Sequence, residues 1–182
     1  MAVAGAAGQP RTWARGRYDD ELRAVILACK ERQGLGLVPL LAELSLGSCA
    51  AALAEVWTGG PVLLVPVPSS RATVAERGFD LTFQLARRVA RGLRPLGLDA
   101  AAGRLLRLTA GRDQVGLSVT DRAANRAHSM RAVPGRPGAV LLLDDIVTSG
   151  ATLTEASRAL SAAGRDVLGA AVLAATPRRQ PR

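Results

Sequence analysis

The sequence of 182 residues contains few aromatic residues, cysteines and histidines. Two Trp, two Phe and one Tyr, scattered along the chain, are too few for a platform on which nucleic-acid bases stack. A zinc site needs about four ligands, but the chain offers only the thiols of Cys29 and Cys49 and the imidazole of His128. Both cysteines lie in apolar segments without CxxC spacing, which indicates buried, reduced thiols. We therefore expect no zinc.

Long apolar runs are also missing. The longest uninterrupted ones are far shorter than the ~18 residues that indicate a membrane-spanning helix. Residues 1–11 include small residues but lack the basic start and long apolar stretch of a signal peptide. With 48% hydrophobic and 21% charged residues, the composition is that of a folded domain. These features predict a cytoplasmic protein without a membrane partner.

Positive charge, in contrast, is abundant. The chain has 24 Lys and Arg against 15 Asp and Glu, a net charge of +9, and Lys30 is its only lysine. The accompanying alanine-rich tracts suggest that codon bias of a GC-rich genome contributes to this composition. Guanidinium groups bind phosphate in a bidentate manner, so the charge favours an anionic partner, either a polymer or a small phosphate ester.

The length is that of one ordinary α/β domain. We expect a flexible leader over residues 1–17, a single domain over residues 18–176 and a basic tail over residues 177–182. Within the domain, residues 18–58 are predicted to form a helical segment and residues 61–176 an α/β core.

Apolar periodicity predicts the elements of this domain. Helical spacing predicts helices from Asp19, from about Leu37, from Asp80 and over residues 151–163. Short apolar runs predict strands at residues 62–65, 105–108, 139–143 and 167–175. Strands that alternate with helices indicate a mainly parallel sheet flanked by helices. Residues 109–131 are too long and polar for a simple connection, which predicts a functional flap with a short helix near 121–127.

One segment, Val140–Thr152, carries a recognisable chemistry. Asp144 and Asp145 end an apolar strand, at the sheet edge where open α/β folds bind ligands. Thr148–Thr152 then leads into a helix, so that small residues and helix amides can hold an anion. A solvated turn and a simple helix N-cap would explain each half alone. Their occurrence in order favours a pocket in which carboxylates accept hydrogen bonds from sugar hydroxyls and amides hold a phosphate, as for a ribose 5-phosphate.

This segment resembles the diphosphoribosyl-binding signature of the type I phosphoribosyltransferases. The resemblance implies that Asp144 and Asp145 bind the ribose hydroxyls of phosphoribosyl diphosphate. It implies that the 5-phosphate is held by Thr148, Ser149, Gly150, Ala151 and Thr152. Mg²⁺ would be bound through the diphosphate, near the two acids. In purine-salvage members an Asp that assists the base often stands at the position of Thr148, so hypoxanthine-guanine chemistry is disfavoured.

From about Tyr18 to Ala174 the chain is similar, in the order and spacing of its motifs, to the ComF family of competence-associated proteins. The motifs are Val65-Pro66-Val67-Pro68, Glu76-Arg77-Gly78-Phe79-Asp80 and Gln114-Val115-Gly116-Leu117-Ser118, followed by Arg122 and Asn125. Asp80 stands where the family usually has Asn, and Leu81 stands where Gln commonly follows. The sequence lacks the four-Cys zinc ribbon with which many members begin, so no contact made through that ribbon is carried over.

Further candidates for the site lie after the first core strand and in the flap. Ser69, Arg71 and Arg77 could meet the diphosphate, or could belong to a solvated loop. The flap carries the candidates for catalysis, Arg112, Gln114 and Arg122, and also Asn125 and Arg126. In related transferases such a flap closes over the site and shields a cationic sugar transition state from water. We expect Lys30 and Arg32 on the solvated face and His128 at the surface.

Two hypotheses follow. The first is a phosphoribosyltransferase that binds phosphoribosyl diphosphate with Mg²⁺ and transfers the phosphoribosyl group to an unknown acceptor, although no residue stands out as its acid or base. The alternative is a non-catalytic ComF-type accessory protein of DNA uptake, with single-stranded DNA or competence proteins as partners, which the charge and the basic tail favour. A homodimer is compatible with either. A generic Rossmann nucleotide-binding domain is disfavoured because no GxGxxG follows a strand.

Overall fold

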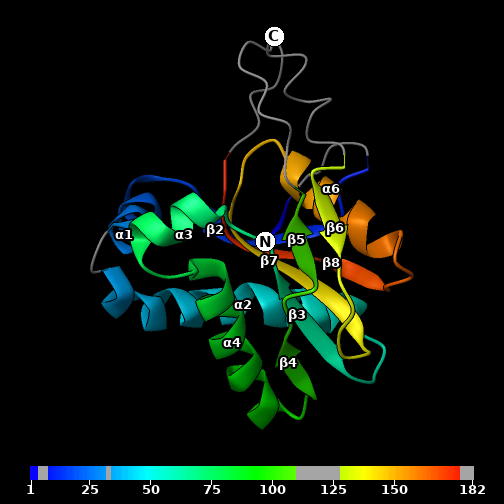
Figure 1. The fold of residues 1–182 in the computed structure, drawn as a ribbon. Coiled ribbons are helices and arrows are strands. Elements are labelled where there is room, and N and C mark those ends of the chain that lie inside the picture. Colours follow the sequence, from blue (N-terminus) through cyan, green and yellow to red (C-terminus); the bar gives the residue numbers. More distant parts are fainter. Residues whose placement is uncertain (4–7, 32–33, 110–127, 177–182) are drawn as a thin grey trace, which may run out of the picture.

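The computed structural model describes residues 1–3, 8–31, 34–109 and 128–176. Six strands form one sheet in the order β1-β2-β8-β7-β3-β4 (Figure 1). The strands are β1 (Ala2–Val3), β2 (Thr12–Arg17), β3 (Val62–Pro66), β4 (Ala100–Ala102), β7 (Ala139–Val147) and β8 (Val167–Ala175). Neighbours from β2 to β4 are parallel, and only β1 runs antiparallel to its partner β2. The predicted α/β fold with a mainly parallel sheet is confirmed.

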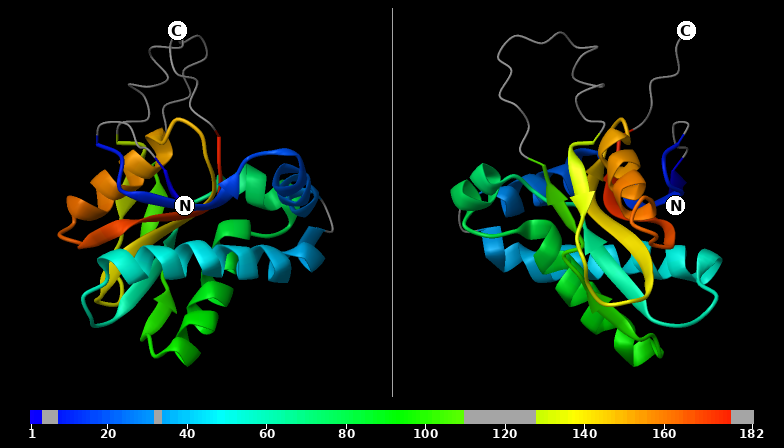
Figure 2. Two further views of the ribbon diagram at one scale, coloured as in Figure 1. Left: turned by 180° about the vertical axis from the view of Figure 1, so that it is seen from behind. Right: turned by 45° about the vertical axis from the view of Figure 1, so that its right-hand side comes forward.

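Helices cover both faces of this sheet (Figures 1 and 2). One face carries α1 (Asp20–Lys30), α2 (Val38–Val56) and α4 (Leu81–Leu93). The other carries α6 (Ala151–Ser161) and an antiparallel hairpin of β5 (Leu106–Leu108) and β6 (Met130–Ala132). The short helix α3 (Arg71–Arg77) follows β3, and two 3₁₀ turns, Gly34–Leu37 and Arg94–Leu96, complete the elements described.

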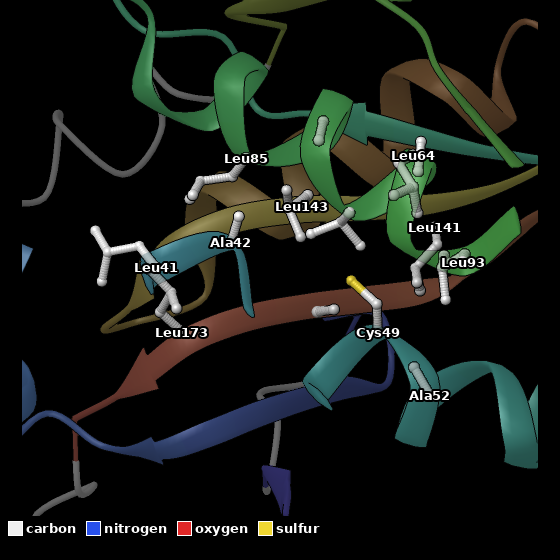
Figure 3. Close-up of a cluster of buried hydrophobic side chains, with 14 of the residues drawn as sticks. Leu41, Ala42, Cys49, Ala52, Leu64, Leu85, Leu93, Leu141, Leu143 and Leu173 are labelled. Carbon is white, nitrogen blue, oxygen red and sulfur yellow. The ribbon is translucent and has the colours of Figure 1, made fainter. Parts of the chain in front are cut away.

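The core lies on both faces of the sheet because β3, β8 and residues 139–143 of β7 carry no charged side chain. Leu141 and Leu143 of β7 pack with α2 and α4, whereas Val140 and Leu142 pack with α6, as the two-residue period of a strand requires. Figure 3 shows the first of these clusters, in which Cys49 of α2 lies among leucines of the sheet. Both cysteines are free and buried, as predicted, and burial raises the pKa of the Cys49 thiol.

The expected leader over residues 1–17 is wrong for its second part. Thr12–Arg17 forms β2, which pairs in parallel with β8. Trp13 is only 1% exposed, and the ammonium group of Met1 donates a hydrogen bond to the carbonyl of Ala14 at 2.8 Å. The sequence did not indicate this strand because its burial depends on pairing with β8, which lies at the far end of the chain.

Three further elements differ from expectation. The polar loop predicted around Arg71 and Arg77 is the helix α3, because Ser70 caps it and accepts a hydrogen bond from the amide of Thr73 at 3.0 Å. The strand β4 was not predicted, since three alanines give no periodic pattern. The strand predicted at residues 105–108 pairs with β6 and not with the main sheet. The predicted helix near 121–127, most of the flap and the basic tail fall outside the described residues.

One helical segment has a high mean hydropathy. Within the described residues, Gly34–Val56 alone has the length and mean hydropathy, 1.7, of a membrane-spanning helix. Its inner side contributes Leu41, Cys49 and Leu53 to the core. A core helix meets the same two criteria, so this property is weak support for a membrane span.

The order in which the chain adds strands reverses between the parallel strands β3 and β7. From β3 the chain passes through α4 to β4 on one side, and from β7 it passes through α6 to β8 on the other. The two connecting helices leave the carboxyl ends of these strands toward opposite faces. In open α/β sheets a crevice at such a point is the usual ligand site.

Candidate functional site

The strand β7 extends beyond its neighbour at this reversal point. β3 ends at Pro66, which pairs with Leu143, whereas β7 continues to Val147 and pairs there with β8 alone. Asp144 and Asp145 lie on this extension and not after the strand, whose predicted end was Leu143. The two acids therefore lie beyond the end of β3, and Asp144 lines a hollow there.

Asp144 is half-buried, and its carboxylate is held by the backbone. Its Oδ1 accepts a hydrogen bond from the amide of Asp145 at 2.9 Å. Burial raises the pKa of Asp144, and the neighbouring charge of Asp145 raises it further, while this hydrogen bond and the positive charge of Lys30 act in the opposite direction. Such a shift, at a carboxylate beside a crevice, is typical of functional sites.

Asp145 points to a different partner. Nζ of Lys30, the last residue of α1, lies 2.7 Å from Oδ2 of Asp145. The prediction that Lys30 lies on the solvated face is wrong, because α1 packs with its end against the site and the side chain is only 27% exposed. Arg32 lies outside the described residues.

The segment after the acids forms a tight turn into α6. Thr148 and Ser149 are exposed, and Gly150 at the helix N-cap has a φ of 80°, a conformation that favours glycine. A glycine provides no side chain to cap the first-turn amides, and the amide of Ala151 donates only a long 3.4 Å hydrogen bond to Oγ of Ser149. This helix N-terminus can therefore receive an anion.

The acid and the turn face one hollow. A cavity of about 20 Å³ is lined by Asp144 and by the turn residues Thr148, Ser149, Gly150 and Thr152. Its volume is enough for about one water molecule. The structure thus brings together five of the residues that the sequence predicted.

Gln9 is a neighbour of this turn that sequence reasoning missed. A Cβ on Gly150 would overlap the amide group of Gln9. Nε2 of Gln9 also donates a hydrogen bond to Oγ1 of the buried Thr12 at 3.2 Å, which ties it to β2. No local signal could have indicated Gln9, because its position depends on the unpredicted strand β2.

A second hollow lies beside the pair of Lys30 and Asp145. This cleft of about 400 Å³ is lined by Lys30, Glu31, Thr73, Glu76 and Arg77. Nε of Arg77 donates a hydrogen bond to the carbonyl of Lys30 at 3.2 Å, so α3 is joined to the end of α1. Of the candidates after β3, Arg77 is therefore near the acids, Arg71 is exposed on the first turn of α3, and Ser69 is half-buried in the connection.

The motif Arg77-Gly78-Phe79-Asp80 joins α3 to α4. Gly78 ends α3 with a φ of 88°, and Asp80 caps α4 by accepting a hydrogen bond from the amide of Phe83 at 3.1 Å. Asp is among the preferred N-cap residues, so Asp80 stabilises this turn.

The base of the predicted flap is anchored by an ion pair between the buried Glu155 and Arg158, whose side chain is 36% exposed. Glu155 of α6 is 4% exposed and accepts a hydrogen bond from the amide of Met130 at 3.0 Å. Arg158 donates to it at 2.6 Å and lowers the pKa of the Glu155 carboxyl. His128 is exposed, as predicted. Arg112, Gln114, Arg122, Asn125 and Arg126 lie outside the described residues.

Comparison with known proteins gives no relative: no family model and no curated protein matches the chain. Within the described ranges, no three His, Cys, Asp or Glu side chains gather as metal ligands. Mg²⁺ commonly binds through one or two carboxylates together with the phosphates of a substrate. The donor set of Asp144 and Asp145 fits a metal that arrives with a diphosphate better than a resident one.

Proposed function

We propose that the chain is a cytoplasmic, type I phosphoribosyltransferase-like protein of the ComF kind, which binds phosphoribosyl diphosphate together with Mg²⁺. The observation that carries this proposal is the single hollow bordered by Asp144 and by the glycine turn into α6, at the reversal point of the sheet. A sugar phosphate needs hydroxyl acceptors and phosphate donors at a short separation, and Asp144 and the first turn of α6 offer both at the rim of this hollow, which itself has room for about one water molecule.

Each part of the ligand then has a partner. The carboxylates of Asp144 and Asp145 accept hydrogen bonds from the ribose hydroxyls. Amides of the first turn of α6, with the hydroxyls of Thr148, Ser149 and Thr152, donate to the 5-phosphate. Arg77 lines the second hollow, beside the pair of Lys30 and Asp145, and is proposed to meet the diphosphate, with Ser69 and Arg71 as weaker candidates. Mg²⁺, when bound with the diphosphate, would neutralise charge on the leaving group.

The proposed reaction transfers the phosphoribosyl group to an acceptor. The bond from C1 of the sugar to the diphosphate breaks, positive charge develops on the sugar, and the acceptor forms the new bond to C1. Such a reaction is accelerated by positioning and by charge stabilisation more than by covalent chemistry. The carboxylate of Asp144 or Asp145 is close enough to the ribose in this scheme to stabilise that charge. The roles of Arg112, Gln114 and Arg122 in the flap stay predictions.

Calorimetric titration with phosphoribosyl diphosphate and Mg²⁺ tests the binding. We expect the double variant Asp144→Asn/Asp145→Asn to lose detectable affinity. Asp99→Asn is the matched control, since Asp99 is 55% exposed and pairs with Arg136 rather than with any residue of the site. An affinity of the double variant equal to that of the unmodified protein would overturn the proposal.

Turnover requires a separate measurement. Incubation of the protein with phosphoribosyl diphosphate, Mg²⁺ and a panel of nucleobases, followed by detection of released diphosphate, identifies both activity and acceptor. Binding without release for any acceptor would instead support the alternative, an accessory protein of DNA uptake that senses the ligand. The net charge of +9 is the feature that favours this alternative.

A further inference from the structure

The ion pair between Lys30 and Asp145 joins two parts of the chain that are far apart in sequence. Its 2.7 Å separation is that of a charge-assisted hydrogen bond, and the side chains are only 27% and 15% exposed. Within the described residues, Lys30 is the one partner seen for the Asp145 carboxylate. Partly buried pairs are screened less by solvent than surface pairs, so this contact has a larger effect than a surface ion pair.

Core packing of its helix and one hydrogen bond hold Lys30 in this position. Ile26 and Cys29 of the same helix are fully buried and anchor the last turns of α1 in the core. The hydrogen bond from Nε of Arg77 to the carbonyl of Lys30, at 3.2 Å, holds the end of the helix from the side of α3. A cation is also favourable at a helix C-terminus because of the helix dipole. The ammonium group is thus presented to Asp145 by structure that exists without a ligand.

The charges around Asp145 favour its ion pair with Lys30. Asp144 is the adjacent residue, and two neighbouring carboxylates repel each other. Cys29 lies within electrostatic reach of Asp145, Lys30 and Arg77, but its pKa is raised chiefly by burial. Within the described residues, Lys30 is the cation in direct contact with Asp145, and Arg77 is joined to this pair by its hydrogen bond to the backbone of Lys30. Removing the Lys30 ammonium would leave a partly buried carboxylate unpaired, which is costly.

We propose that Lys30 is a positioning residue of the sugar site: its ammonium group orients the carboxylate of Asp145 and balances its charge, so that Asp145 can accept hydrogen bonds from ligand hydroxyls. This inference rests on the proposed function. It extends the site from one segment of the core to the end of α1.

Binding of two probes, ribose 5-phosphate and inorganic phosphate, by the full chain tests the proposal. We expect Lys30→Met to weaken ribose 5-phosphate binding about tenfold and to leave phosphate binding unchanged, because only the first probe has hydroxyls for Asp145. Lys30→Arg keeps a cation and should retain more affinity than Lys30→Met. In an Asp145→Asn background, Lys30→Met should cause no further loss, because Lys30 acts through Asp145.

Arg136→Met is the matched control. It removes another 2.7 Å ion pair, that of Arg136 with Asp99, which is half-exposed on both sides and lies away from the site. We expect it to leave both affinities unchanged. Thermal unfolding of each variant reports whether it folds. If Lys30→Met does not fold, the ribose 5-phosphate affinities of Lys30→Arg and Asp145→Asn are compared. The proposal then requires Lys30→Arg to bind more tightly than Asp145→Asn.

The outcomes separate the two proposals. Unchanged ribose 5-phosphate affinity in Lys30→Met, or additive losses with Asp145→Asn, would overturn the role of Lys30 while leaving the proposed function intact. An equal loss of both probes would show that Lys30 merely supports the fold, which also overturns it. If the unmodified protein does not bind ribose 5-phosphate at all, the proposed function fails and the inference fails with it.

Discussion

The Asp144 carboxyl lowers the stability of the folded protein at neutral pH, because burial disfavours its ionised form. Burial raises its pKa, and the charge of Asp145 raises it further. A carboxyl whose pKa is higher in the folded state favours folding only while it is protonated, so its contribution is lost as the pH rises through the folded-state pKa. Asn at this position keeps an oxygen that can accept the 2.9 Å hydrogen bond from the amide of Asp145.

We therefore expect Asp144→Asn to raise the melting temperature at pH 7 by about 2–4 °C, which corresponds to about 1 kcal/mol in a chain of this size. The gain should shrink as the pH falls toward about 4, where the acid is protonated in both states. Asp145→Asn should act in the opposite direction, because it leaves Lys30 without its partner. Thermal unfolding of both variants over this pH range checks the prediction, and an equal loss of stability in the two would contradict it.

Gly150 favours glycine because of its φ of 80°, and a Cβ there would also displace the end of the Gln9 side chain. Gly164, which follows α6, has a similar φ of 72° but open space around it. Gly164→Ala should cost about 1–2 kcal/mol for the left-handed conformation alone. Gly150→Ala should lower the free energy of unfolding by more than Gly164→Ala does. In a Gln9→Ala background, the loss caused by Gly150→Ala should fall to that of Gly164→Ala. Denaturant unfolding measures all three, and equal costs of the two glycine variants would show that Gln9 has no effect.

At the scale of elements, β2 makes the first residues of the chain part of the sheet. Trp13 is 1% exposed, and its Nε1 donates a hydrogen bond to Glu55 of α2 at 3.0 Å. Loss of a buried aromatic side chain of this size costs about 3–5 kcal/mol. We expect Trp13→Ala to destabilise the protein by that amount and Trp57→Ala, at a half-buried position, by clearly less. Equal free energies of unfolding for the two variants would argue against a structural role of β2.

Elements were predictable where burial leaves a local pattern. β3, β8 and residues 139–143 of β7 are continuous apolar runs because both of their faces are covered, and α4 and α6 repeat apolar residues at helical spacing. β4 and β2 have no such pattern, since their burial depends on neighbouring strands. The same distinction holds in the site. Asp144 and the glycine turn lie within one short segment, whereas Lys30 and Gln9 reach it only through the folding of distant segments.

At the scale of the whole molecule, the two hollows near the acids of β7 are lined by groups from different elements. α6 supplies the glycine turn from one face, and α1 with α3 supplies Lys30 and Arg77 from the other. The acids on β7 stand between them. In the proposed function, this arrangement would let groups from separate elements contact one small ligand.

The net charge of +9 belongs to the molecule as a whole and not to this crevice. Three arginines with exposed side chains, Arg11, Arg104 and Arg136, already pair with carboxylates of the protein. We therefore expect only weak, sequence-independent binding of single-stranded DNA, visible in a gel shift at about 50 mM salt and lost at about 200 mM. Asp144→Asn/Asp145→Asn should not weaken it, because these acids only add negative charge. Binding that prefers one base composition and survives the higher salt would instead require a dedicated DNA surface, and would favour the accessory role in DNA uptake over the transferase.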